Sequence, residues 1–336
     1  MQQTRAVVRT DALRANAEFF RAASGVKLCA VVKADGYGHG AAAVARALCG
    51  LSDCFAVALV EEGARLRHAG VAGDILVLCP PLCEGEVLRA AYHGLVLTVS
   101  DGQDAALIAR ACARYGLRVR CHVKLNTGMN RFGLDGRALA RFLASPPVAG
   151  LCVEGVYSHF YRPEDAAVRE GQFARFLRMA EAVEGRFGKL CRHIAATGGA
   201  LCGRRYAQDM VRVGLGLYGY APEGFCAPAL RPALRVYASV AAARAYRYGG
   251  AGYGGYLPQG GPLSVVRAGY ADGFFRTGQG RNALCMDAFV AERPLQKYED
   301  VCLFSDADAY ARAHGTVSYE VLVRACSRAV KEYADF

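Results

Sequence analysis

Short apolar runs alternate with longer amphipathic stretches over the first two-thirds of the chain. We interpret eight of these runs as strands: Val26–Val32, Phe55–Leu59, Asp74–Leu78, Leu95–Val99, Arg118–Leu125, Leu151–Tyr157, Leu190–Ala196 and Val211–Leu217. The runs at 55–59, 75–78 and 95–99 are almost wholly apolar, which is typical of strands that are covered on both faces. The pattern therefore favours a parallel sheet over an antiparallel one.

The stretches between these runs have the spacing of amphipathic helices. Predicted helices cover Ala41–Leu48, Glu61–His68, Glu84–Tyr92, Gln103–Tyr115, Arg137–Leu143 and Gln172–Phe187. Ser100 and Asp101 are typical of a helix start, and Gly116 of a helix end. Strand and helix alternate so often that a closed (β/α)8 barrel is predicted, with an open doubly wound sheet as the alternative. Gly214 and Gly216 lack the third glycine of a dinucleotide fingerprint.

The pattern changes after about Gly219. A proline-containing connector leads into alternating segments separated by glycine-rich turns, which predict a mostly β second domain. These segments are Leu234–Ala242, Leu263–Ala268, Ala283–Val290 and Val301–Phe304, followed by one late helix at Tyr319–Val330. We therefore expect a barrel over residues 1–222 and a mostly β domain over 223–336. Roughly the first ten residues could pack with the second domain.

Composition narrows the classes of protein to consider. The 336 residues carry a net charge of +11, but the 41 lysines and arginines are scattered, so a nucleic-acid surface has little support. The 14 cysteines include no Cys-x-x-Cys pair, and we expect no metal site. Charged residues interrupt the start of the chain, and no long apolar stretch could span a membrane. We expect a protein of the reducing cytoplasm.

Active sites of (β/α)8 barrels lie at the carboxyl ends of the strands, so the residues that follow each strand are candidates. The first strand runs into Ala-Val-Val-Lys33-Ala-Asp-Gly-Tyr37-Gly-His-Gly. Burial at a barrel mouth lowers the pKa of an amine and makes it a usable base or nucleophile. A lone strand-end lysine is more often a solvated cap, so Lys33 needs supporting residues.

Two further strand ends carry candidate groups. The fifth strand leads into Lys124-Leu-Asn-Thr-Gly-Met-Asn-Arg131-Phe-Gly, in which Arg131 could bind a substrate carboxylate through two parallel hydrogen bonds. The alternative is a loop arginine that pairs with a surface acid. The sixth strand ends at Tyr157-Ser-His159, where a histidine suits acid–base work or orientation; a purely structural histidine is equally compatible.

The seventh and eighth strands provide the strongest physical signal in the chain. Thr197 is followed by two glycines, and the eighth strand reads Arg212-Val-Gly214-Leu215-Gly-Leu-Tyr-Gly. Backbone amides beside glycines, together with a threonine hydroxyl, can cradle a phosphate, and these are the loops in which barrels commonly bind one. We therefore expect a phosphorylated ligand at the mouth that Lys33 faces.

These residues and their order resemble the alanine racemases, a family of fold-type III pyridoxal phosphate (PLP) enzymes. The resemblance covers nearly the whole chain, from Lys33 to Tyr319. It rests on Ala-Val-Val-Lys-Ala-Asp-Gly-Tyr-Gly-His-Gly, on Lys-Leu-Asn-Thr-Gly-Met-Asn-Arg-Phe-Gly, and on Gly-Tyr270-Ala-Asp-Gly followed by Cys-Met286-Asp. Each motif is specific, and all three occur in the family's order.

The resemblance implies a role for each matching residue. Lys33 would hold PLP as a Schiff base and act as one of two catalytic bases, with Tyr253 of a partner subunit as the other. Arg131 would bind the substrate carboxylate beside the backbone of the partner's Met286. The phosphate would be bound by Tyr37, Thr197, Gly214, Leu215 and Tyr319. Arg212 would donate to the pyridine nitrogen, His159 would bridge toward Arg212 and Tyr253, and Tyr270 and Tyr319 would line the substrate entrance.

The sequence departs from the family pattern at several positions. Ala196 and Thr197 stand where the family usually has Asn-Ser. Asn126 replaces the usual aspartate after the strand-five lysine, which leaves the carbamylation of Lys124 seen in many members an open question. The usual Arg-Val-Pro-Arg near the carboxyl end is Arg328-Ala-Val-Lys331, and the second domain is short. These differences bear on turnover rate more than on reaction type.

The resemblance implies a homodimer that interconverts L-alanine and D-alanine and supplies D-alanine for peptidoglycan. A site shared between the barrel mouth of one chain and a tyrosine of the other needs two chains. The alternatives are a serine or broad-specificity racemase, a non-catalytic PLP-binding homeostasis protein and a PLP decarboxylase on a related fold. Tyr319 in the side-chain pocket favours alanine, and the second domain with Tyr253 argues against the homeostasis protein.

Overall fold

The computed structural model describes residues 4–146, 149–245, 249–250, 252–253, 261–277, 283–291 and 293–335. These residues form two compact units. The first, called here the β unit, contains residues 4–13, 35–43 and the described residues from 231 onward. The second, called the barrel unit, contains residues 14–34 and the described residues of 44–230.

Eight parallel strands form the barrel unit: β2 (Lys27–Val31), β3 (Cys54–Val57), β4 (Asp74–Val77), β5 (Leu97–Val99), β6 (Val119–Lys124), β7 (Leu151–Tyr157), β8 (Cys191–His193) and β9 (Met210–Val213). β9 pairs with β2, and a parallel bridge between Leu76 and Val96 joins β4 to β5. The backbone amide of Arg212 donates to Ala195 at 2.9 Å and joins β9 to the segment after β8. The sheet is therefore closed, and the predicted barrel is confirmed over the alternative of an open sheet.

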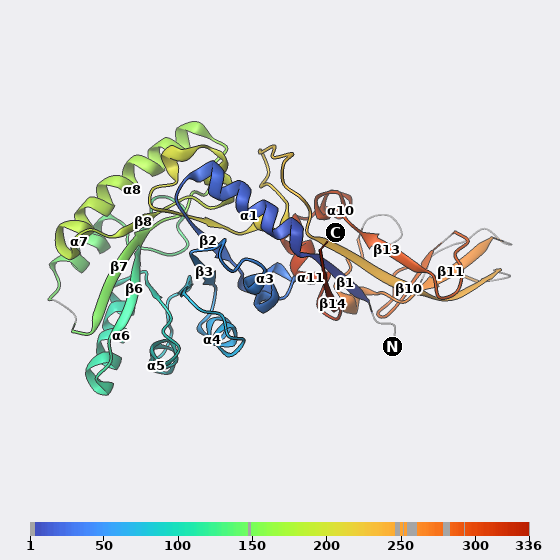
Figure 1. Ribbon diagram of the computed structural model, residues 1–336, viewed down its shortest axis with the longest axis horizontal. Helices are drawn as coiled ribbons and strands as arrows, with labels where there is room; N and C mark the ends of the chain where they lie inside the picture. The colour runs from blue at the N-terminus through green and yellow to red at the C-terminus, as the bar shows by residue number, and fades with distance from the viewer. Residues whose placement is uncertain are drawn as a thin grey trace. The chain divides into compact units, whose positions relative to one another are not determined.

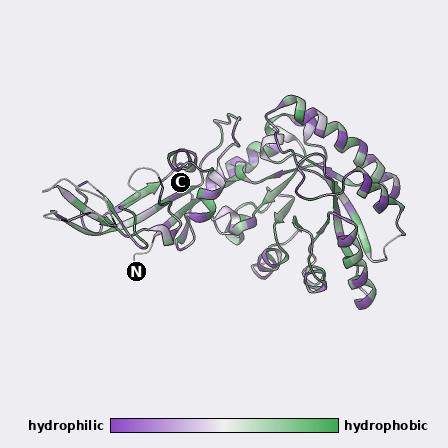
Figure 2. Ribbon diagram, turned by 180° about the vertical axis from the view of Figure 1, so that it is seen from behind, coloured by the Kyte–Doolittle hydropathy of each residue, from purple (hydrophilic) through white to green (hydrophobic). Residues whose placement is uncertain are grey.

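Helices follow the barrel strands and lie outside them in Figure 1. They are α3 (Ala41–Ala47), α4 (Val60–His68), α5 (Glu84–Tyr92), α6 (Gly102–Tyr115), α7 (Gly136–Ala144) and α8 (Ala166–Phe187). Figure 2 shows hydrophilic and hydrophobic residues interleaved along α8, as expected of a helix with one face on the sheet. Asp101 caps α6 by accepting from Gln103 and Asp104, and Gly116 ends it in the left-handed conformation, as predicted.

The structure corrects two predicted boundaries and adds three elements that were not predicted. The eighth strand ends at Val213 instead of Leu217, because the chain turns at Gly214 into the 3-10 helix η2 (Leu215–Tyr218). The predicted helix at 172–187 begins six residues earlier, where Asp165 caps α8. Helices α1 (Thr10–Ser24) and α9 (Thr197–Leu201) and the 3-10 turn η1 (Arg204–Tyr206) were not predicted. The glycine-rich sequence after Thr197 reads as a loop, although it forms one helical turn.

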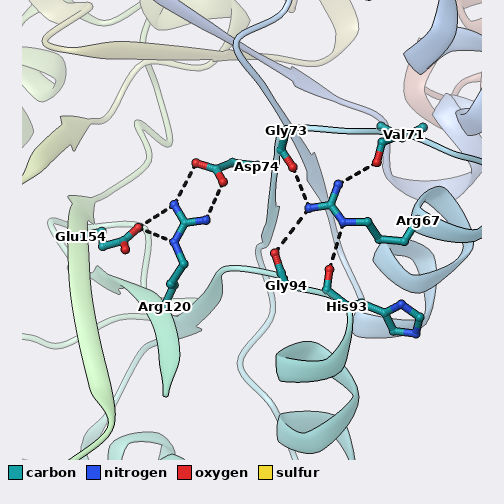
Figure 3. Close-up of polar contacts among 8 residues, drawn as sticks. All are labelled: Arg67, Val71, Gly73, Asp74, His93, Gly94, Arg120 and Glu154. Carbon is teal, nitrogen blue, oxygen red and sulfur yellow. Dashed lines mark hydrogen bonds and ion pairs between the residues drawn. The ribbon is translucent and has the colours of Figure 1, made fainter. Parts of the chain in front are cut away.

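The amino ends of the barrel strands are joined by charged side chains (Figure 3). Arg120 on β6 donates to Asp74 at the start of β4, at 2.6 and 2.9 Å, and to Glu154 on β7 at 2.8 Å. Arg67, near the end of α4, donates to the carbonyl oxygens of Val71, Gly73, His93 and Gly94. Arg120 thus links two strands that are not neighbours in the sheet.

The β unit is built on a mixed sheet in the order β12-β11-β10-β1-β14, with β13 also paired to β10. Its strands are β1 (Arg5–Arg9), β10 (Leu234–Ala245), β11 (Pro262–Val266), β12 (Phe289–Ala291), β13 (Asp300–Phe304) and β14 (Val330–Ala334). Two helices, α10 (Ala307–His314) and α11 (Ser318–Arg324), and the 3-10 turn η3 (Tyr270–Asp272) complete it. The prediction of a barrel followed by a mostly β domain is confirmed in its class.

The prediction of one late helix over Tyr319–Val330 was wrong. α11 ends at Arg324, and Val330 begins β14, which pairs in parallel with β1. The apolar residues of this segment satisfy either a helical or a strand pattern, and the pairing with β1 decides between them. Among the described residues, none of the helices combines the length and apolar character that crossing a lipid bilayer requires.

Candidate active site

Most of the residues predicted to carry chemistry lie at the carboxyl ends of the barrel strands. Lys33 follows β2, Lys124 is the last residue of β6, and His159 follows β7. Thr197 begins α9 after β8, and Arg212 lies in β9 immediately before the turn at Gly214. Because all eight strands are parallel, these ends share one face of the barrel unit, which is called the mouth here.

Arg212 is buried, and its guanidinium donates to His193, to the carbonyl oxygen of Ser158 and, more weakly, to that of Ile194 at 3.4 Å. Nη1 donates to Nδ1 of His193 at 2.7 Å, and Nη2 donates to the carbonyl oxygen of Ser158 at 2.6 Å. The ring of Tyr157 lies 5.0 Å from the guanidinium carbon. This fixed orientation presents a permanently charged donor, as a ring nitrogen of a cofactor would need.

A chain of two buried histidines continues from Arg212. Since the guanidinium can only donate, Nδ1 of His193 accepts, and its Nε2 donates to Nδ1 of His122 at 2.8 Å. Burial and the positive charge of Arg212 hold the pKa of His193 well below its ordinary value, and burial lowers that of His122 to about 4. Both rings are therefore neutral at pH 7. Sequence analysis missed them; His122 lies two residues before Lys124, on the same face of β6.

Burial lowers the pKa of Lys33, and the nearby charges of Arg131 and Arg212 lower it further. Cys79 and Glu62 act in the opposite direction and raise the pKa of Lys33. A lysine in such surroundings holds its proton less tightly than a solvated one and is a better nucleophile. The physical expectation for Lys33 thus agrees with its place in the barrel.

Lys124 is more deeply buried than Lys33. Its Nζ lies 4.7 Å from the ring centre of Tyr157 and 5.8 Å from that of Phe132. Burial, reinforced by Arg212 and Arg131, lowers the pKa of Lys124 to about 7. His159 has the same surroundings, and burial together with these cations holds its pKa well below the ordinary value. Burial and neighbouring positive charge therefore lower the pKa of both Lys124 and His159.

Arg131 projects from the loop that connects β6 to α7, and its side chain is exposed. Two backbone bonds between the segments 124–126 and Leu134, each 2.9 Å long, close the loop, and the Oδ1 of Asn126 accepts from the amides of Gly128 and Asn130 at 3.1 Å. A side chain at Gly133 would meet the backbone of Leu125 at 2.6 Å. Asn126, in place of the family's usual aspartate, still shapes the loop that carries Arg131.

The segments after β8 and β9 meet at the mouth. The hydroxyl of Thr197 accepts from the amide of Gly216 at 3.1 Å. A side chain at Gly216 would lie 2.4 Å from Phe20, so only glycine brings these two turns together. Ala196, at the N-cap of α9, has no side-chain group for the first amides of that turn. The two turns expected to bind a phosphate are thus joined to each other at the mouth.

In the β unit, Tyr37 is buried and its ring lies 6.1 Å from that of Tyr319. Tyr253 is 72% exposed, with the guanidinium of Arg276 5.9 Å from its ring centre. Met286 is 52% exposed, and its carbonyl accepts from Ala271 at 3.0 Å beside the turn at Tyr270. The structure therefore holds Tyr270 and Met286 together within this unit. Gly254, the next residue after Tyr253 in the sequence, lies outside the described residues.

The backbone that follows Lys33 was also missed by sequence analysis. The short helix α2 (Lys33–Tyr37) is left-handed, because Ala34, Asp35 and Tyr37 have φ values of 52°, 53° and 51°. Each non-glycine residue in this conformation costs about 1 kcal/mol or more, so surrounding contacts must hold it. The glycines at 36, 38 and 40 predict a turn, but they do not indicate that the turn is left-handed.

Comparison with known proteins assigns the chain to a family. Residues 8–222 match the family model of the alanine racemase N-terminal domain. The chain is 34% identical to an alanine racemase of Treponema pallidum, over 99% of this chain and all of the relative. An alanine racemase of Synechocystis is also 34% identical, over 96% of this chain and 97% of the relative.

The chain belongs to the alanine racemase family.

Solved structures of alanine racemases agree with this assignment. The enzyme from Bacillus anthracis with bound L-Ala-P has a TM-score of 0.91 at 26% identity, covering 99% of this chain and 95% of that one. The enzyme from the D-cycloserine producer Streptomyces lavendulae has a TM-score of 0.90 at 28% identity, covering 100% and 98%. The alanine racemase family comprises isomerases, so the predicted enzyme class and family are confirmed.

Proposed function

We propose that this chain interconverts L-alanine and D-alanine with PLP bound at the barrel mouth. The observation that carries the proposal is Lys33, at a barrel-strand end, with its pKa lowered by burial and by Arg131 and Arg212. The donor set fits the cofactor: an amine for its aldehyde, a held guanidinium for its ring nitrogen, and the turns at Thr197, Gly214 and Leu215 for its phosphate. We further propose that Tyr37 and Tyr319 serve the phosphate.

When bound, PLP withdraws electrons from the substrate and acidifies its α-proton. Racemisation then needs one base on each face of a planar carbon. We assign Lys33 to one face and Tyr253 of a partner subunit to the other. Arg131, beside the partner's Met286 and Tyr270, would bind the substrate carboxylate, and His159 would orient Arg212 and the partner's tyrosine.

The proposed role of Arg212 depends on its guanidinium keeping its proton. A guanidinium at the pyridine nitrogen stays charged and does not protonate the ring, which makes the ring a weaker electron sink than a pyridinium. We infer that this favours return of the proton to the same carbon and limits side reactions such as transamination. Hydrogen bonds to His193, Ser158 and Ile194 support Arg212 in this role.

We propose a homodimer with shared active sites. Tyr253 and Met286 are exposed in their own chain, as groups that serve a partner should be. Apolar side chains also lie exposed on the barrel unit after strands β3, β4, β6 and β7, among them Leu59, Leu82 and Phe132. Exposed apolar side chains in such numbers favour a covered face. Supply of D-alanine for peptidoglycan, and the cytoplasm as the place of action, remain predictions.

Three finer proposals follow. Lys124 has a pKa of about 7, so much of its amine is neutral at physiological pH, as carbamylation by carbon dioxide requires. We therefore propose a carbamylated Lys124 that braces Arg131. We also propose a division near residue 222 between the cofactor-binding barrel and the β domain, with residues 4–13 and 35–43 belonging to the β unit. Alanine is proposed over serine as the preferred substrate, and the ratio of kcat/KM for the two L-amino acids tests this.

The decisive assay incubates the purified protein and PLP with L-alanine in deuterated water. We expect D-alanine to form with deuterium at the α-carbon. A Tyr253→Phe variant should lose exchange from the L side by at least about 100-fold, because it lacks a proton-transfer group. Tyr298→Phe, also an exposed tyrosine of the β unit, is the matched control and should keep its rate. A wild-type protein that binds no PLP and exchanges no deuterium would overturn the proposal.

A further inference from the structure

One short part of the chain, residues 319–333, contacts the left-handed turn after Lys33 at several points. Residues 34–38 all have positive φ values, and three of the five are not glycine. Such a run is intrinsically unfavourable for L-amino acids, and it persists only where the surroundings determine it. The turn includes Tyr37 and begins one residue after Lys33. Its conformation therefore fixes the backbone positions from which the side chains of Lys33 and Tyr37 extend.

Within the turn, Asp35 and His39 satisfy part of the backbone. The carboxylate oxygen Oδ1 of Asp35 accepts from the amide of Ala41 at 2.9 Å, and its carbonyl accepts from Gly40 at 2.8 Å. Nδ1 of the buried His39 donates to the carbonyls of Tyr37 at 2.9 Å and Gly36 at 3.1 Å. These local bonds leave one carboxylate oxygen of Asp35 and the carbonyl of His39 for other partners.

The carboxyl-terminal segment supplies both partners. Nζ of Lys331 donates to Oδ2 of Asp35 at 2.8 Å, and the hydroxyl of Tyr333 donates to the carbonyl of His39 at 3.1 Å. Both residues belong to β14, which is paired over five positions with β1 and is therefore fixed in register. One bond holds Asp35 near the start of the turn, and the other holds His39 immediately after its last residue.

Close backbone packing adds a steric constraint. A side chain at Gly38 would lie 2.3 Å from the carbonyl oxygen of Leu322 in α11, and one at Gly40 would lie 2.1 Å from the hydroxyl of Tyr333. The ring of Tyr319, also in α11, packs beside that of Tyr37. Residues of both α11 and β14 thus pack against the turn.

We propose that Tyr319, Leu322, Lys331 and Tyr333 form a carboxyl-terminal clamp that holds the turn after Lys33 ready to bind PLP. In this view Lys331 and Tyr333 are positioning residues: they touch neither cofactor nor substrate and act through Asp35 and His39. The clamp rests on the proposed function, because the ligand whose binding it promotes is PLP. A preorganised turn binds more tightly, since the ordering is complete before the ligand arrives.

The test is a titration of the full-length apoprotein with PLP, followed by the absorbance of the bound cofactor and by its rate of release. Lys331→Met removes the ion pair but keeps the apolar stem, and Tyr333→Phe removes a single hydroxyl. We expect each variant to raise the Kd for PLP about 5- to 10-fold, and the double variant to raise it further, through faster release. Lys331→Arg should restore nearly wild-type binding. Lys297→Met, an exposed lysine of the β unit, is the control.

A double-mutant cycle with Asp35→Asn tests whether Lys331 acts through Asp35. If Lys331 acts through Asp35, the Asp35→Asn, Lys331→Met double variant should bind PLP no more weakly than the worse single variant. Additive losses, or losses equal to that of Lys297→Met, would overturn the clamp. So would a wild-type Kd in Lys331→Met and Tyr333→Phe while the wild-type protein binds PLP and racemises alanine. A wild-type protein without PLP binding would instead refute the proposed function, and the clamp with it.

Discussion

Positively charged side chains form ion pairs with carboxylates at one end of the barrel, whereas those described at the other end do not. At the amino ends of the strands, Arg120 bonds to two carboxylates, and Arg192 bonds to Glu184 at 3.0 Å. At the mouth stand Lys33, Lys124, Arg131 and Arg212, and within the described part of the chain none of them forms an ion pair with a carboxylate. Paired charges join strands, whereas unneutralised ones attract anions.

This difference shows where the molecule gives up stability for binding. Four cations in one region repel one another, and two of them are lysines whose pKa values are lowered by burial and further by these neighbouring charges. A phosphate and a carboxylate would relieve that repulsion, which is what PLP and an amino acid provide. The amino ends have no such task, so their charges are free to hold the barrel together.

The largest expected effect comes from removing the amine at the mouth. Lys33→Met should lower kcat/KM by at least about 1000-fold, because the proposed nucleophile and base is gone. The free energy of unfolding of the apoprotein should not fall, since a partly buried cation is replaced by an apolar chain. Racemisation assays and urea unfolding measure the two quantities. Lys27→Met, at the exposed start of the same strand, should change neither; a marked loss of stability in Lys33→Met would contradict the comparison.

At the amino ends of the strands, we expect a substitution to lower stability and to leave PLP affinity and kcat nearly unchanged. Arg120→Met removes the link between β4, β6 and β7 and should lower the free energy of unfolding by about 1 kcal/mol, a modest value because the three side chains are partly solvated. The PLP affinity and kcat should stay within about twofold of wild type. Arg114→Met breaks a more exposed ion pair of 3.5 Å and serves as the control. A loss of PLP binding in Arg120→Met would break the separation of roles.

The most gradual effect is the pH dependence of stability that Lys124 contributes, because it is spread over several pH units. Its pKa is about 7 in the folded protein and 10.5 in the unfolded chain. Between these values the unfolded state binds more protons, so the free energy of unfolding should rise with pH, by at most about 1.4 kcal/mol per unit, and level off below pH 7. Lys124→Met should flatten this rise in carbonate-free buffer. An unchanged pH profile in the variant would show that Lys124 is not the group responsible.

The barrel was predictable because its signals are local and repeated. Apolar strands such as 74–78 and capped helices such as 103–115 are determined by residues close together in the chain. The late helix at 319–330 was mispredicted because its apolar residues fit two patterns, and the pairing of β14 with β1, more than 300 residues away in sequence, decides between them. Single strand pairings at such a distance leave no periodic trace.

The sequence by itself determined the barrel, the family and the identity of the residues at the strand ends, because motifs and periodicity survive without coordinates. Only the tertiary structure decided how those residues are supported. The chain from Arg212 through His193 to His122, the lowered pKa of Lys124 and the left-handed turn held by Lys331 and Tyr333 all join residues that are distant in sequence. Burial and hydrogen-bond geometry arise from packing, and packing is a property of the folded chain.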